Sequence, residues 1–116
     1  MRVRNFFAMA AVSSLLVCST PAMAEGTANA FLEAIDSQSN ITLQILNGYM
    51  NGMDWMNTEL GSIGQPMIYC APEKLAITAD QNADILREYV RENKWIGEVP
   101  AGLALLQAYK ATFPCD

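Results

Sequence analysis

The cysteines at positions 70 and 115 constrain the fold of this 116-residue chain more than any other feature. A bond between them would tie the C-terminus to the middle of the chain and close a long loop. The third cysteine, Cys18, lies in an apolar segment near the N-terminus. The pairing of Cys70 and Cys115 therefore depends on where the chain folds and on what becomes of Cys18.

The first 24 residues have the three parts of a cleavable secretory signal peptide. Arg2 and Arg4 give a positive start, and residues 6–17 form an uncharged, mostly apolar run. Residues 22–24, Ala-Met-Ala, place small side chains where signal peptidase cuts. The apolar run is shorter than the about 20 residues that span a bilayer, which disfavours a stable membrane anchor.

Cleavage is expected after Ala24, which leaves residues 25–116 as the mature domain. A lipoprotein signal is disfavoured because Val17, before Cys18, is not a small residue. Cys18 would leave with the leader, and the mature domain would work in the periplasm, where disulfides form.

One disulfide between Cys70 and Cys115 is the favoured pairing, because an even cysteine count in a secreted domain indicates a bridge. A metal site and a reactive thiol are the other readings. The chain has no histidine to complete a zinc shell with two sulfurs, and no C-x-x-C spacing. On the chain-entropy model the bridge would stabilise the fold by about 4 kcal/mol.

The mature domain is strongly acidic. Removing residues 1–24 takes away two of the seven basic residues and none of the 12 acidic ones, so the net charge becomes about −7. Such a domain repels phosphates, which excludes nucleic acid and anionic membrane surfaces as electrostatic partners. A basic protein is the natural complement.

Apolar residues recur at helical spacing and predict an all-α fold, a small bundle of about four helices. Residues 25–60 read as helix with a break at 36–40, where Asn40 is the expected N-cap of the second part. One row of the second part is expected in the core; it comprises Ile41, Ile45, Tyr49, Met53 and Met56. Gly48 and Gly52, four residues apart, are expected to allow close approach of another helix or loop.

The second half of the chain carries its own start and stop signals. Gly61 is placed to end the long helix and residues 61–66 to form a loop. Thr78 and Gln81 match a capping box, while Pro100 suits the start of a last helix. The expected core residues are Tyr49, Leu86, Tyr89, Leu106, Tyr109 and Phe113.

No residue pattern indicates catalysis, so we expect no enzyme, no metal site and no cofactor. The usual general base near neutral pH is absent because the chain has no histidine. Carboxylates four apart, such as Asp80 and Asp84, are far more often a solvated pair than a catalytic one. No phosphate loop or dinucleotide motif is present.

Four short sequence motifs follow one another along the chain in a distinctive order. They are residues 48–52 (GYMNG), 69–72 (YCAP), the stretch 78–93, and 108–115 (AYKATFPC). Together they resemble the Rap/Tai family of immunity proteins, which protect bacteria from type VI secretion amidase effectors. The residues that carry the motifs are Gly48, Tyr49, Gly52, Cys70, Pro72, Phe113, Pro114 and Cys115. Many members carry a further cysteine where this chain has Leu46-Asn47.

The resemblance implies a small helical periplasmic protein, often a homodimer, that binds a peptidoglycan amidase and blocks its active-site cleft. The alternative is a periplasmic acid-stress chaperone, because that class also comprises all-helical, single-disulfide domains of similar size that release buried surface in acid. Both functions would reside in a binding surface.

Two turns are the candidate contacts with a protein partner. Trp95 lies in the polar turn of residues 93–99, where an aromatic side chain either folds over the core or is offered to a partner. The loop of residues 61–66 is the second candidate. The candidate contact residues are Trp95, Lys94, Glu98, Ser62 and Gln65.

Overall fold

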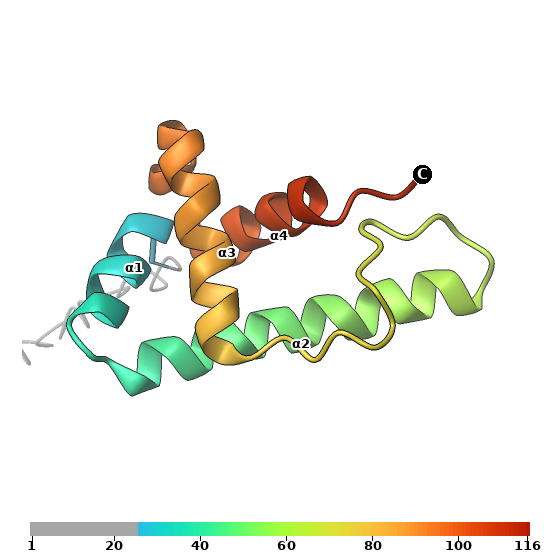
Figure 1. Ribbon diagram of the computed structural model, residues 1–116, viewed down its shortest axis with the longest axis horizontal. Helices are drawn as coiled ribbons and strands as arrows, with labels where there is room; N and C mark the ends of the chain where they lie inside the picture. Colours follow the sequence, from blue (N-terminus) through green and yellow to red (C-terminus); the bar gives the residue numbers. More distant parts are fainter. Residues whose placement is uncertain (1–25) are drawn as a thin grey trace, which may run out of the picture.

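Four α-helices and one short 3₁₀ helix build the domain in the computed structural model, which describes residues 26–116 (Figure 1). They are α1 (Ala28–Asp36), α2 (Asn40–Ser62), α3 (Ala79–Glu92), the 3₁₀ helix η1 (Lys94–Glu98) and α4 (Ala101–Thr112). The all-α fold predicted from the sequence is confirmed. The signal peptide predicted for residues 1–24 lies outside the described residues.

Side-chain caps set the starts of the first three helices. Thr27 caps α1, and Thr78 and Gln81 form the predicted capping box at the start of α3. The N-cap of α2 is Ser39 and not Asn40, because the Ser39 hydroxyl accepts the free N–H of Thr42. Each cap satisfies a backbone donor that the helix itself leaves without a partner.

The long helix α2 is the base of the domain, and α3 crosses it while α1 and α4 pack around this crossing (Figure 1). The start of the described chain is tied to the start of α4. Ala28 N–H donates to Val99 O at 2.9 Å, and Ala101 N–H donates to Gly26 O, also at 2.9 Å. These bonds join segments far apart in the sequence.

The core lies where α1, α3 and α4 meet the first half of α2. Leu86 and Tyr109, two of the six predicted core residues, are fully buried. The other four pack against the core but are only half-buried; they are Tyr49, Tyr89, Leu106 and Phe113. The largest fully buried side chains are Tyr69, Tyr109, Leu46, Leu86, Ile96, Leu105 and Asn82.

The prediction of which row of α2 lies in the core is mostly wrong. Ile41, Ile45 and Met56 are exposed, whereas Leu46 and Met50 are buried. Two overlapping apolar rows run along α2, and the other helices cover only one of them. Beyond the first half of α2, the helix extends past its neighbours and is accompanied by the segment that returns towards α3 (Figure 1).

Candidate partner-binding surfaces

The turn that follows α2 is a structured projection. Gly64 has a positive φ of 73°, and its N–H donates to Gly61 O, while Gln65 N–H donates to Leu60 O. This pair of bonds is a Schellman motif, which needs a left-handed residue directly after the helix. The predicted stop at Gly61 is therefore wrong: α2 continues to Ser62, and Gly64 reverses the chain.

Every residue from 61 to 66 is exposed, and none of them carries a charge. Ile63 is 60% exposed, and Ser62 Oγ donates to Glu59 O at 2.8 Å. We name this turn, together with Trp55, the loop end. Trp55 is 75% exposed and lies two turns before Ser62 on the same side of α2.

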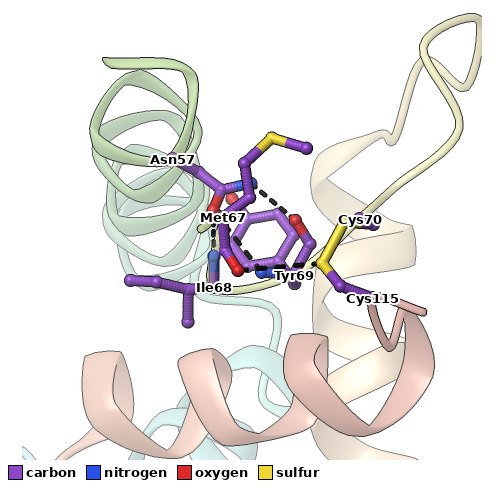
Figure 2. The surroundings of a disulfide bond; sticks show 6 residues. All are labelled: Asn57, Met67, Ile68, Tyr69, Cys70 and Cys115. Carbon is purple, nitrogen blue, oxygen red and sulfur yellow. Dashed lines mark hydrogen bonds between the residues drawn. A yellow bond between two sulfur atoms is a disulfide. The ribbon is translucent and has the colours of Figure 1, made fainter. Parts of the chain in front are cut away.

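One buried asparagine holds the chain where it leaves the loop end (Figure 2). Asn57 Oδ1 accepts from Ile68 N–H at 2.7 Å, and Asn57 Nδ2 donates to Tyr69 O at 2.7 Å. The Tyr69 ring is buried below, and its hydroxyl donates to Asp54. Residues 68–69 are thus fixed to α2 in two ways: their backbone bonds to Asn57, and the Tyr69 side chain bonds to Asp54.

The predicted disulfide between Cys70 and Cys115 is present and ties the C-terminus to the residue that follows Tyr69 (Figure 2). Beside it, Cys70 N–H donates to Phe113 O at 2.8 Å. The bridge therefore ties the C-terminus to the return segment just after the point that Asn57 holds. Pro114, between Phe113 and Cys115, lies beyond the last helical turn, as predicted. Pro72, the remaining residue of the proposed motif, is exposed.

The second predicted surface lies on η1. Trp95 is 68% exposed, so it does not fold over the core, whereas its neighbour Ile96 is only 1% exposed and anchors η1. Lys94 is exposed, and Glu98 Oε1 accepts from Asn29 Nδ2 at 3.0 Å. Glu98 is therefore engaged with the N-terminal turn of α1.

The five predicted contact residues do not form one surface. Ser62 and Gln65 belong to the loop end, at the C-terminal tip of α2, whereas η1 follows the opposite, upper end of α3 (Figure 1). The two groups are therefore two separate candidate surfaces.

A third surface, which the sequence did not reveal, is an apolar groove of about 460 Å³ between α2 and α4. Its lining includes Gly48, Gly52 and Met56 from α2, and Gly102 and Leu103 from α4. A Cβ atom added at Gly48 or Gly52 would have no neighbour within 4 Å. The close helix contact predicted at these two glycines is therefore wrong, because α4 stands off and leaves a groove.

Trp55 was also missed from the sequence. It falls outside the apolar row of α2 that was expected in the core, and an aromatic residue off such a row was itself a signal. Asn57 gave the complementary signal: it is a polar residue at a helical position that continues the row of Leu46 and Met50. Its role depends on residues 68–69, which periodicity does not place.

The ion pairs of the described region lie on its surface. Arg87 contacts Asp36 and Asp84, and Arg91 contacts Glu88. Exposed pairs of this kind contribute little stability. Among residues 26–116, no group of acidic or cysteine side chains could hold a metal ion.

Two buried tyrosines have perturbed acidities. Burial, followed by the hydrogen bond to Asp54, raises the pKa of Tyr69 above its ordinary value. Burial and the Asp54 charge also raise the pKa of Tyr109. Both tyrosines are therefore neutral structural groups near pH 7.

Comparison of the chain with protein-family models, with curated proteins and with solved structures finds no match. In the described part of the chain, none of the helices has the length and apolar character needed to cross a membrane.

Proposed function

We propose that the protein is an exported inhibitor that binds a peptidoglycan amidase and blocks its active-site cleft, as an immunity protein does. The observation that carries this proposal is the loop end, a projecting turn that is exposed throughout yet held on both sides. The Schellman motif fixes its start, and Asn57 with the disulfide fixes the chain after it.

A turn of this kind suits an enzyme cleft. A loop that is already ordered loses less conformational entropy on binding than a free loop does. Trp55 and Ile63 supply exposed apolar anchors, and Ser62 and Gln65 supply polar groups beside them. Interface energy is usually concentrated in a few such anchors with polar surroundings.

The charge of the chain supports a basic partner. Outside the loop end the described surface carries most of the carboxylates, and these would attract a basic amidase over distance. The turn itself has no charged side chain that would have to leave water in the cleft, and the nearby Glu59 carboxylate, 3.3 Å from Ser62 Oγ, lies at its edge.

The test uses two matched, exposed tryptophans on different surfaces, Trp55 of the loop end and Trp95 of η1. Purified protein is titrated into cysteine–histidine peptidoglycan amidases, beginning with any encoded beside its gene, and both Kd and residual hydrolysis are measured. Trp55→Ala and Ile63→Ala should weaken binding by about 2 kcal/mol each. Trp95→Ala should leave Kd unchanged, and all three variants should melt like the parent because these side chains are exposed.

The opposite ranking would move the binding surface to η1 and refute the role of the loop end. An absence of inhibition across the amidases would refute the proposed function itself.

The acid-stress chaperone remains the alternative, and the apolar groove between α2 and α4 is the observation that favours it. A chaperone would suppress aggregation of unrelated unfolded proteins at low pH and would leave amidases active at neutral pH. The same purified protein can be used to measure both properties.

A further inference from the structure

A cavity of about 420 Å³ lies between residues 50–58 of α2 and residues 67–77, which run back beside that helix (Figure 1). Its charged lining residues are Asp54, from α2, and Glu73, from the returning segment. We name this cavity the return pocket. Its volume lies in the range of cavities that take up ligands, about 300 to 1,000 Å³.

Both walls of the return pocket are held in place. Asn57, which is 7% exposed, bonds to the backbone of residues 68–69. The disulfide holds the next residue, Cys70. Asp54 is fixed as well, because its Oδ1 accepts the Tyr69 hydroxyl. The pocket is therefore formed before any ligand arrives, and binding costs little conformational entropy.

The two carboxylates of the pocket have no cation. Among residues 26–116 neither Asp54 nor Glu73 forms an ion pair, and Asp54 Oδ2 has no hydrogen-bond partner there. Both arginines of this region already contact other carboxylates. Lys74 follows Glu73 but does not line the pocket. Carboxylates on two walls of one cavity stabilise a positive charge placed between them and repel an anion.

The rest of the lining is largely apolar. Met50 is buried and Ile77 is half-buried, while Met67 and Leu75 are 43% and 47% exposed. Lysine and arginine side chains have an aliphatic stem that lies along apolar surface and a charged end that keeps polar partners. The pocket offers a matching surface to each part, so its lining favours a cation on an aliphatic stem.

The position of the pocket indicates the source of the cation. Thr58 lines the pocket and lies between Trp55 and Ser62 on one side of α2, at steps of three and four residues. The pocket therefore adjoins the loop end. A protein that covers the loop end also meets the return pocket.

We propose that the return pocket receives a lysine or arginine side chain of the protein that binds the loop end, with Asp54 and Glu73 beside the cation. This inference rests on the proposed function for the identity of that protein, a basic amidase. The pocket adds specificity to the apolar anchors of the loop end, because a partner without the cation would leave both carboxylates unpaired.

A side-chain analogue tests the pocket without an amidase. Disulfide-bonded, isotope-labelled protein is titrated with Nα-acetyl-lysine methylamide, and NMR follows the backbone amides of Thr58 and Glu73. A ligand of this size should bind with a Kd of about 1 mM. The norleucine analogue, which has the same stem without the ammonium group, should bind at least about 10-fold more weakly.

Two substitutions remove the charges of the pocket one at a time. Asp54→Asn should weaken binding of the lysine analogue about 10-fold, and Glu73→Gln, at a more exposed position, about 3-fold. The asparagine oxygen can still accept the Tyr69 hydroxyl, so the variant should melt like the parent. Glu33→Gln is the matched control, because it removes an exposed carboxylate away from the pocket, and it should leave Kd unchanged.

Equal binding of the lysine and norleucine analogues overturns the inference, as does lysine binding that is unchanged in both pocket variants. Free cadaverine that binds about 100-fold more tightly than the lysine analogue would assign the pocket to a small diamine and overturn its role in docking. An amidase that binds the parent and Asp54→Asn equally well also overturns the inference, but leaves the proposed function standing. Binding of the lysine analogue in the absence of any amidase binding supports the pocket and refutes the proposed function alone.

Discussion

The hydroxyl of Tyr109, on α4, donates a hydrogen bond to Oδ1 of Asn82, on α3, inside the fully buried core. Asn82 Nδ2 in turn donates to Asn47 Oδ1, on α2, at 3.1 Å. The three helices that meet at the core are therefore joined by one polar chain. Because every side chain in this hydrogen-bonded network has a partner, the network fixes how the helices meet without leaving a buried polar group unpaired.

Replacing Asn82 with alanine should destabilise the protein by about 1 to 3 kcal/mol, because the buried Tyr109 hydroxyl loses its acceptor. Urea unfolding at pH 7 measures the loss. Asn51→Ala, at an exposed position of α2, is the control and should change stability by no more than about 0.5 kcal/mol. Equal effects of the two substitutions would contradict the role of the buried chain.

Stability should fall as the pH rises above about 10, the ordinary pKa of tyrosine. The folded-state pKa values of Tyr69 and Tyr109 are raised, so the unfolded chain loses these protons first and alkali favours unfolding. Between pH 10 and 11 each tyrosine should contribute a loss of about 1 kcal/mol. Tyr69→Phe should flatten the dependence over this range, and an unchanged slope would show that Tyr69 is not its source.

Reduction of the Cys70–Cys115 disulfide should lower the free energy of unfolding by up to about 4 kcal/mol, because the bridge closes a long loop in the unfolded chain. Oxidised protein that comprises residues 25–116, and so lacks Cys18, should resist alkylation completely and have a mass two hydrogens below that of its reduced form. Rapid alkylation of Cys70 without a reductant would contradict the bridge.

Adjacent leucines of α4 should respond differently to truncation. Leu105 is fully buried, so Leu105→Ala should cost about 2 to 5 kcal/mol. Leu106 is half-buried at the groove, so Leu106→Ala should cost clearly less. Chemical unfolding of the two variants in parallel gives the comparison, and a larger loss at Leu106 would mean that α4 is rotated from the described orientation.

Gly97→Ala should destabilise the protein, because the added methyl group meets the Asn29 side chain and forces it away from Glu98. Because Asn29 is exposed and its amide is the free end of a flexible side chain, the loss should be small, up to about 1 kcal/mol, the worth of its hydrogen bond to Glu98. The double variant Gly97→Ala with Asn29→Ala should recover part of this loss. If thermal melting shows no recovery, the collision with Asn29 is not the cause.

The amino-acid sequence by itself determined the helices, their main boundaries and the disulfide. Helical periodicity, the capping box at Thr78 and the two cysteines that remain once Cys18 is assigned to the predicted leader are local or compositional signals, and each can be recognised without knowledge of the neighbours. The break between α1 and α2 was predicted for the same reason, although the cap proved to be Ser39.

Only the tertiary structure decided which side of each helix is covered. Apolar residues on α2 form two overlapping rows, and periodicity cannot choose between them because both satisfy helical spacing. The choice depends on where α3 and α4 cross α2, and it leaves Ile41, Ile45 and Met56 exposed. For the same reason Gly48 and Gly52 border a groove and not a helix contact. The sequence determines the spacing of these two glycines, but the side chains packed between the helices set the distance from α2 to the next helix.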